Sequence, residues 1–225
     1  MLKEFISSVS IFDGLDDQSM SSLEKIVSVR DYPKGSMIIL EEEFGDIVFI
    51  VMNGTVKITR VNDEGREVIL AMLGEYEIFG EMAIIDGEAR SANALAQEDC
   101  KLIAISSEDF IRLLKENFSV SLALMGELAK RLRKSDQHIE ALSLSDAEHR
   151  IGVSILNLAE EIGVIRRGKV TIENLPFQQD IANMSGTSRE TVSRILKLFE
   201  DRSLITKDGH KVLIPDYLYF KKCFG

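Results

Sequence analysis

The feature that most constrains this chain is a long series of seam residues spaced alternately by three and four positions. Its members are Phe118, Ser121, Met125, Leu128, Leu132, Ser135, Ile139 and Leu142. This spacing is typical of a narrow coiled-coil seam, and no proline interrupts the stretch from about Phe110 to Leu144. We therefore predict one long helix that pairs with a second copy of the chain. The alternative is a helix packed on its own domain.

Length and charge favour a molecule of two parts. The 225 residues suffice for two modest domains, and 45% hydrophobic with 28% charged residues is ordinary for a globular protein. The net charge of −10 argues superficially against a nucleic-acid partner. However, residues 146–225 carry 12 Lys and Arg against 11 Asp and Glu, whereas the rest carries 15 against 26. The near-neutral C-terminal part, with its clustered arginines, can meet phosphate.

The cysteines and the N-terminus exclude several classes of protein. Cys100 and Cys223 lie far apart, so neither a structural zinc site nor an iron–sulfur cluster bound by four thiolates is expected. Residues 1–12 show no cleavage pattern, and no apolar run approaches the roughly 20 residues of a membrane span. We expect a cytoplasmic protein without a membrane partner or a bound metal.

Residues 29–104 contain short apolar runs separated by turn residues, which predicts an antiparallel sandwich or barrel. Asn53-Gly54, between two of these runs, is the strongest hairpin signal in the chain. Two short helices are predicted before this region. The predicted helices span residues 2–8 and 16–27, and the predicted strands span residues 37–40, 47–52, 56–59, 68–73, 92–95 and 102–105.

The C-terminal part predicts a winged helix-turn-helix. Helices expected at residues 178–184 and 189–201 are separated by Ser185-Gly186-Thr187, a short turn that contains glycine. Apolar runs at 204–205 and 212–214 flank a hairpin, the expected wing. Before these elements we expect a hinge near Asp146, an amphipathic helix at 151–162 and an exposed basic loop at 164–169.

A polar constellation lies within the strand-rich region. Gly80 allows close approach of the backbone to a ligand, and amides near residues 81–83 can donate to an anion. Arg90 and Ser91 offer a guanidinium and a hydroxyl to a phosphate, while the Glu81 carboxylate can accept from sugar hydroxyls. Together these groups describe a phosphorylated ribose. A surface ion pair between Glu81 and Arg90 is the alternative.

The second constellation lies on the helix expected at 189–201. Arg189, Glu190, Ser193 and Arg194 cluster towards one face and one end of it. Arginine pairs with guanine O6 and N7, and glutamate can accept from cytosine N4. The alternative for Glu190 is a capping box that begins at Thr187 and ties the carboxylate to its own helix start.

Two motifs carry a resemblance to a known family. Residues 79–92, which open with Phe-Gly-Glu and close with Arg-Ser-Ala, resemble the phosphate-binding cassette of cyclic-nucleotide-binding domains. The string Ser-Arg-Glu-Thr-Val-x-Arg at 188–194 resembles the recognition helix of the catabolite-activator (CRP/FNR) family of bacterial transcription regulators. The likeness covers essentially the full length, and the turns at 34–35 and 53–54 also fall where that barrel fold has them.

The resemblance implies an α+β chain with three parts. These are a cyclic-nucleotide-binding β-roll, or jelly roll, at 1–109, a dimerisation helix at 110–145 and a winged helix-turn-helix DNA-binding domain at 146–225. It implies that Glu81 contacts the ribose, that Arg90 and Ser91 contact the cyclic phosphate and that two helix residues contact the purine. The implied nucleotide-binding set is Gly80, Glu81, Met82, Ala83, Arg90, Ser91, Ser135 and Asp136. The implied DNA-binding set is Gln178, Gln179, Ser188, Arg189, Glu190, Thr191 and Arg194.

The sequence departs from the family at two positions. Asp136 stands where the cyclic-AMP receptors have a hydroxyl residue. Its carboxylate could accept from adenine or from guanine, so cAMP is expected and cGMP stays open; Asp136 could also be a solvated helix residue. Phe177 stands where the family often has a threonine or serine, so its side chain cannot supply the helix cap or phosphate contact that a hydroxyl makes there.

The resemblance predicts a homodimeric transcription regulator that a cyclic nucleotide controls allosterically. Its recognition helices would sit one DNA turn apart, roughly 34 Å, on a palindromic operator, with RNA polymerase as a further partner. The alternative is a relative that binds DNA without a cyclic nucleotide or with a different effector; haem is disfavoured because none of the three histidines lies in the barrel. An enzyme is not expected, because no nucleophile and base accompany Glu81.

Overall fold

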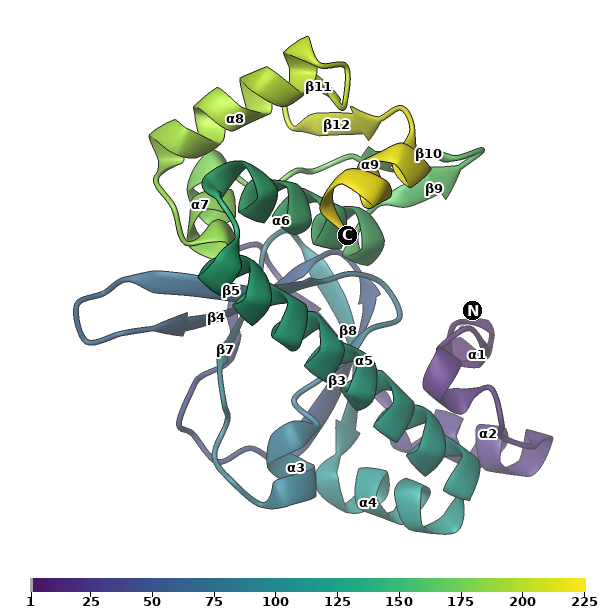
Figure 1. Ribbon diagram of the computed structural model, residues 1–225. Helices are drawn as coiled ribbons and strands as arrows, with labels where there is room; N and C mark the ends of the chain where they lie inside the picture. The colour runs from purple at the N-terminus through teal and green to yellow at the C-terminus, as the bar shows by residue number, and fades with distance from the viewer. Residues whose placement is uncertain (1) are drawn as a thin grey trace. The chain divides into compact units, whose positions relative to one another are not determined.

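A computed structural model of the chain describes residues 2–225 (Figure 1). Contacts divide the chain into two compact units. The first contains the residues up to 60 together with 73–132, and the second contains 61–72 together with 133–225. The domain boundaries expected after residues 109 and 145 remain predictions.

The first unit is built around two four-stranded antiparallel sheets, with strand orders β1-β8-β3-β6 and β2-β7-β4-β5. The predicted strand-rich sandwich is therefore confirmed, and β1 and β6 are strands that the sequence analysis missed. The strands are β1 (Ser28–Tyr32), β2 (Met37–Ile39), β3 (Ile47–Asn53), β4 (Val56–Val61), β5 (Glu67–Leu73), β6 (Ile78–Phe79), β7 (Asn93–Ala96) and β8 (Cys100–Ser106). Val61 of β4 and all of β5 except Leu73 belong to the second unit.

The predicted hairpin at Asn53-Gly54 is wrong. A tight turn does form there, but β3 pairs with β6 and β8 whereas β4 pairs with β7, so the turn carries the chain from one sheet to the other. Gly54 has φ +91°, and a Cβ at this position would lie 2.8 Å from the carbonyl oxygen of Asp99. The glycine therefore serves a close approach to the β7–β8 connection rather than a hairpin.

Helices cover the β1-β8-β3-β6 sheet and complete the core of the first unit. They are α1 (Leu2–Ser7), the 3₁₀ turn η1 (Ser10–Phe12), α2 (Asp17–Ile26), α3 (Met82–Asp86), α4 (Ser107–Glu116) and the first part of α5 (Phe118–Leu144). Phe12, Ile50, Ile103 and Phe110 are almost fully buried in one apolar cluster. The predicted helices at 2–8 and 16–27 correspond to α1 and α2.

The single helix predicted from about Phe110 is broken. Asn117 adopts an extended conformation between α4 and α5, and its side chain donates to the carbonyl oxygen of Leu113 at 3.0 Å. Ser121, a polar member of the predicted seam, donates its hydroxyl across this break to the carbonyl oxygen of Leu114 at 2.7 Å. Asparagine and serine compete for backbone groups in this way, which explains why helical periodicity did not reveal the break.

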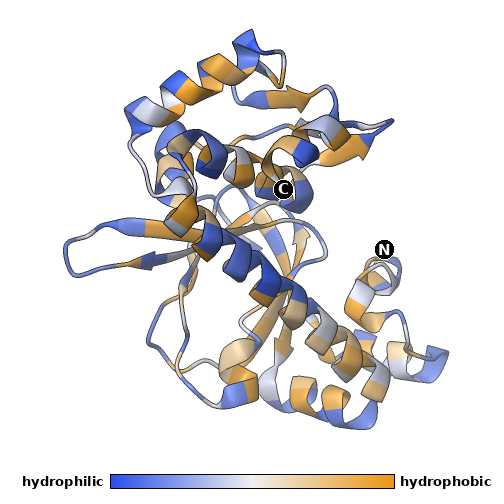
Figure 2. Ribbon diagram, in the orientation of Figure 1, coloured by the Kyte–Doolittle hydropathy of each residue, from blue (hydrophilic) through white to orange (hydrophobic). Residues whose placement is uncertain are grey.

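Helix α5 has two apolar faces. Val120 and Leu124 are buried in the core of the first unit. The predicted seam lies on the other face, where Phe118, Leu132 and Ile139 are 73%, 63% and 61% exposed within one chain. One face of α5 therefore packs on its own unit, as the alternative expected, and the pairing of the exposed seam with a second copy stays a prediction. The most hydrophilic part of α5 is its middle (Figure 2).

The second unit is a winged helix-turn-helix, as predicted (Figure 1). Helices α7 and α8 form the motif, and β11 and β12 form the wing in a sheet of order β11-β12-β10-β9. Ile69 and Met72 of β5 are buried in the apolar core of this unit. The elements are α6 (Ala147–Glu161), β9 (Val164–Arg166), β10 (Lys169–Ile172), α7 (Gln178–Ser185), α8 (Arg189–Asp201), β11 (Thr206–Asp208), β12 (Lys211–Ile214) and α9 (Tyr217–Phe224).

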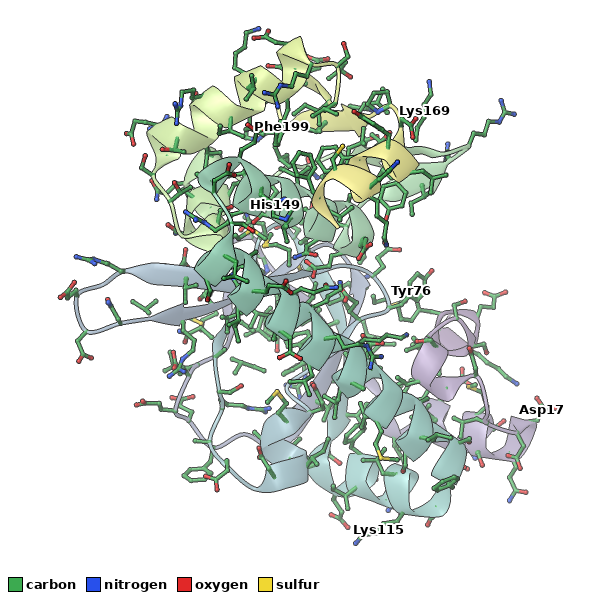
Figure 3. All side chains as sticks on the ribbon, viewed as in Figure 1. Asp17, Tyr76, Lys115, His149, Lys169 and Phe199 are labelled. Carbon is green, nitrogen blue, oxygen red and sulfur yellow. The ribbon has the colours of Figure 1, made fainter. Side chains whose placement is uncertain are left out.

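Two elements of the second unit differ from the prediction. The expected basic loop at 164–169 is a β-hairpin, because β9 pairs with β10. The helix α9 was not predicted; Asp216 caps it, and its rings pack on the core. Figure 3 labels Phe199 on α8. The centroid of its ring lies 6.1 Å from that of Phe220 and 5.1 Å from that of Phe224. Eight residues are too few for a clear helical period, which explains why α9 was not predicted.

Two predicted absences can be compared with the structure. Among residues 2–225, no helix has both the length and the apolar character needed to cross a membrane. The same residues contain no cluster of three or more histidine, cysteine, aspartate or glutamate side chains that could hold a metal ion.

Candidate functional site

Glu81, at the start of α3, forms a buried ion pair within the first unit. Its residue is 1% exposed, and its Oε1 accepts from Nη1 of Arg131 on α5 at 3.0 Å. Arg131 also donates through Nη2 to the carbonyl oxygen of Ile78. Burial raises the pKa of Glu81, while the charges of Arg131 and then Arg90 oppose that shift. Through this ion pair, α5 holds the Glu81 carboxylate in place at the site.

Arg90 lies in a narrow slot between two glycines. Its guanidinium donates to the carbonyl oxygens of Gly80 and, at 2.7 Å, of Ile47. A Cβ on Gly45 would come within 2.2 Å of the guanidinium, and one on Gly80 within 2.8 Å. Burial lowers the pKa of Arg90, while Asp46 and Glu81 oppose that shift. The two carbonyls use two of the five N–H donors, which leaves donors for an anion.

The structure brings the predicted residues of the cassette together. Gly80, with φ +78°, turns the chain into α3, where Ala83 is buried and Met82 is half exposed. Ser91 is exposed beside the buried Arg90. The alternative considered for these residues, a surface ion pair between Glu81 and Arg90, is not formed, because Glu81 pairs with Arg131 instead.

Ser135 and Asp136 are exposed on the part of α5 that belongs to the second unit. Their contact with a purine stays a prediction. Arg131 is the site residue that the sequence analysis missed. It lies four positions before Ser135, hence on the same face of the helix, and this spacing was the signal that could have identified it.

The second constellation lies on the helix-turn-helix. Gly186, in the left-handed conformation at φ +58°, ends α7, and Ser188 caps α8 by accepting from the amide of Thr191 at 3.2 Å. Because the cap is Ser188, the capping box considered from Thr187 is not formed. Hydrogen bonds from its own amide and from Ser188 lower the pKa of the exposed Glu190.

The exposed start of α8 presents a polar groove of about 480 Å³. It is lined by Gln178, Arg189, Glu190, Ser193, Arg194 and Lys197. Four of the seven predicted DNA-binding residues thus share one groove with an additional lysine. Gln179 is exposed beside it and donates to the side chain of Asn183 at 3.0 Å. The groove offers guanidinium donors and a carboxylate acceptor, the groups that read base edges in the major groove.

Comparison with known proteins assigns both units. The family model of the cyclic nucleotide-binding domain matches residues 29–117, and that of the Crp-like helix-turn-helix domain matches residues 150–222. The chain is 30% identical over 215 residues, 96% of each chain, to the CRP-like cAMP-activated global transcriptional regulator of Mycobacterium tuberculosis. It is 33% identical to the cyclic AMP receptor protein of Thermus thermophilus over 87% of each chain. This chain belongs to the CRP/FNR family.

Solved structures agree with this assignment. The catabolite activator protein of Thermus thermophilus is similar with a TM-score of 0.54 at 29% identity, over 95% of this chain and 97% of that one. FixK2 from Bradyrhizobium japonicum shares the fold with a TM-score of 0.78 at 20% identity, over 89% and 98%. The predicted family and fold class are confirmed. The family consists of transcription regulators rather than enzymes, in agreement with the prediction.

Phe177 shows how this CRP/FNR chain replaces an expected polar cap. It caps α7 without a side-chain hydrogen bond, and Asp180 reaches back to accept from its amide at 3.1 Å. The Phe177 ring packs edge-on against His210 of the wing, 5.1 Å between centroids. The position therefore joins the wing to α7 through an apolar contact.

Proposed function

We propose that this CRP/FNR-family chain acts as a homodimer whose affinity for a palindromic operator is controlled by a cyclic nucleotide, with cAMP as the effector. The observation that carries this proposal is the ion pair between Glu81 and Arg131. It joins the cassette to α5, the helix that bears the uncovered seam. A ligand that takes over hydrogen bonds of Glu81 therefore acts directly on the helix expected to pair.

The chemistry of the site suits a cyclic nucleotide. Arg90 carries a positive charge in a slot lined by glycine, where an anion replaces lost solvation. Ser91 adds a hydroxyl donor next to it, and the Glu81 carboxylate can accept from a ribose hydroxyl. In the proposed complex Ser135 and Asp136 contact the purine.

The seam of α5 supports pairing with a second copy. Phe118, Met125, Leu132, Ile139 and Leu142 remain 44–73% exposed in one chain, at the three-and-four spacing of a coiled coil. Burial of such side chains contributes about 1.5–3 kcal/mol each. A two-fold dimer would present two copies of α8 to two half-sites, which is why the operator is expected to be palindromic. The proposal includes a cytoplasmic location, where the operator lies, and a contact with RNA polymerase.

Titration of the purified protein tests the proposal. Duplexes selected from a random pool would give the operator, and its affinity would be measured without nucleotide, with cAMP and with cGMP. We expect cAMP to strengthen binding by roughly 5–150-fold, the usual size of allosteric coupling. Glu81→Gln should reduce this factor, while Glu64→Gln, an exposed change in the β4–β5 turn, should not. Equal affinity at saturating cAMP and cGMP and without either would refute cyclic-nucleotide control.

One observation favours the second candidate, a family member that responds to another effector or to none. Glu81 and Arg90 already have protein partners, in Arg131 and in two main-chain carbonyls. A ligand must therefore compete with Arg131 for Glu81 or use only the remaining N–H donors of Arg90. Calorimetry with cAMP and cGMP separates the candidates, because this alternative predicts no heat of binding from either while DNA binding persists.

A further inference from the structure

Arg150, in the first turn of α6, joins the ends of two other helices of the second unit. Its Nη1 donates to the carbonyl oxygen of Ser145 at 2.8 Å, and its Nε donates to that of Ser185 at 2.9 Å. Nη2 lies 3.5 Å from the carbonyl oxygen of Gly186. No acidic side chain among residues 2–225 forms a salt bridge with Arg150. The guanidinium is therefore held by main-chain carbonyls.

These carbonyls lie at helix C-termini. Ser145 directly follows α5, and Ser185 is the last residue of α7. The last carbonyls of a helix lack partners within the helix and form the negative end of its dipole. A guanidinium can satisfy two such ends at once because its N–H groups diverge in a rigid plane. The ammonium group of lysine lacks this fork.

An apolar contact and a buried hydrogen bond reinforce the same junction. A Cβ on Gly186 would lie 2.9 Å from Cδ2 of Leu142, so the last turns of α5 pack directly on the turn of the helix-turn-helix. The hydroxyls of Ser154 and Ser185 lie 2.9 Å apart, and both residues are buried. Because α8 begins three residues after Gly186, its start is fixed to the end of α5.

We propose that Arg150 is the positioning residue that transmits the pairing geometry of α5 to the recognition helix α8. The link from α5 to α6 is only Ser145-Asp146, yet each of its residues has two soft torsions. The covalent link alone therefore leaves the direction of α7 and α8 open. Arg150 removes this freedom by tying Ser145 to Ser185. The inference rests on the proposed function, which requires two recognition helices at a fixed separation.

Spacer length on the DNA provides the test. Each additional base pair moves one half-site by about 3.4 Å, so a rigid dimer favours one spacer. Wild type, Arg150→Gln and Arg150→Lys would be titrated, with and without cAMP, against duplexes that share the selected half-sites but differ by one or two base pairs between them. We expect the wild type to discriminate by roughly tenfold or more, of the order of one mismatched base pair. The Gln variant should bind all spacers within about threefold, and the Lys variant should fall between them.

The controls separate positioning from simple damage. Arg166→Gln changes an exposed arginine on β9 of the same unit and should keep the spacer preference. Sedimentation and cAMP calorimetry should give wild-type values for both Arg150 variants, because the dimer seam and the cassette are intact. If Arg150→Gln does not fold, Arg150→Lys decides the matter, since it keeps the charge and loses only the fork.

Each outcome has one meaning. A wild-type spacer preference in a folded Arg150→Gln protein, or in Arg150→Lys where the former does not fold, overturns the inference. A lower melting temperature with unchanged spacer preference also overturns it, because Arg150 would then be merely structural. A wild type that selects one spacer but ignores cAMP would refute the proposed nucleotide control and leave the role of Arg150 standing.

Discussion

Glu81 and Arg131 form an ion pair in which the carboxylate side chain is 2% exposed and the guanidinium side chain 30% exposed, with Oε1 and Nη1 3.0 Å apart. The two residues are 50 positions apart in the sequence, one at the start of α3 and the other on α5. A buried carboxylate depends on such a partner, because loss of solvation is offset only by charge and hydrogen bonds. Removal of Arg131 should therefore be far more damaging than simultaneous removal of both charges.

Arg131→Met should lower the free energy of unfolding by about 2–4 kcal/mol near neutral pH, because it leaves a buried charge without its partner. Burial already raises the pKa of Glu81, and loss of Arg131 raises it further. A carboxyl with a raised folded-state pKa stabilises the fold fully below its unfolded pKa, and that stability is lost as the pH rises through the folded pKa. The defect should therefore be smaller at pH 5 than at pH 7.5 in urea unfolding. The Glu81→Gln/Arg131→Met double variant should recover most of the loss, and an equal defect in the double variant would contradict this account.

The slot around Arg90 predicts the effect of a single methyl group. Gly45→Ala would place a Cβ within 2.2 Å of the Arg90 guanidinium, so the guanidinium must move. Because the Arg90 side chain is flexible, it can move without unfolding the protein. We expect nucleotide affinity to fall by about tenfold or more, the loss of one charge-assisted hydrogen bond. Gly126→Ala is the matched control, because its Cβ meets nothing within 4 Å. Calorimetry with cAMP measures both, and unchanged affinity in Gly45→Ala would remove Arg90 from the site.

Local patterns predicted most of the elements but not the contacts that tie them together. The turn between α7 and α8 was predictable because Gly186 and the apolar period on either side act locally. The break in the helix at Asn117 was not predictable, because it depends on side-chain hydrogen bonds from Asn117 and Ser121 to the carbonyl oxygens of Leu113 and Leu114. Asn53-Gly54 has the sequence of a hairpin, yet Gly54 lies against the main chain at Asp99, and the chain continues from there into the other sheet.

The candidate site shows the same division. Glu81 and Arg90 could be chosen from their motif, whereas their partners could not. Arg131 pairs with Glu81 through tertiary packing, and the Gly45 side of the slot lies 45 residues from Arg90 in the sequence. Sequence patterns thus identified the groups that can meet a ligand, and the structure identified what holds them.

The seam of α5 predicts the oligomeric state. Leu132→Asp replaces an exposed seam leucine with a charge at the expected two-fold interface. Burial of each leucine contributes about 1.5–3 kcal/mol, and a two-fold interface buries one such leucine from each chain. The dimer dissociation constant should therefore rise by roughly 10²-fold or more. Leu218→Asp, at a leucine on α9 that is even more exposed than Leu132, should leave the dissociation constant unchanged. Sedimentation equilibrium distinguishes the two, and a Leu132→Asp protein that stays dimeric would exclude this seam.

The groove on α8 predicts separate effects on affinity and specificity. Arg194→Ala should cost about 1–3 kcal/mol on the selected operator, because it removes the bidentate contact to guanine that we propose for Arg194. The loss should shrink on a duplex in which the contacted guanine is changed. Arg166→Ala, on β9, should not weaken binding in this sequence-dependent way. Titrations at constant salt concentration are required, since phosphate contacts depend steeply on salt.

Two adjacent carboxyls at the end of α6 predict opposite dependences of stability on pH. The Glu161 side chain, 10% exposed, accepts from the amide of Met72 at 3.3 Å and from Lys134 at 3.4 Å. Burial raises its pKa although Lys134 and Met72 oppose the shift. For Glu160, burial acts in the same direction, but hydrogen bonds from Lys221 and Tyr217 prevail and lower the pKa.

The raised pKa of Glu161 gives stability that is complete below the unfolded pKa and is lost as the pH rises through the folded pKa. Glu161→Gln cannot ionise, so its stability does not fall in this way, and its amide oxygen can still accept from the amide of Met72. Relative to the wild type, the variant should therefore become more stable as the pH rises above about 4.5. Glu160→Gln should behave in the opposite way, because the stability from Glu160 is present above its unfolded pKa and disappears as the pH falls through its folded pKa. Urea unfolding of all three proteins between pH 4 and pH 8 measures both differences. If the two differences have the same sign across this range, burial does not dominate the ionisation of Glu161.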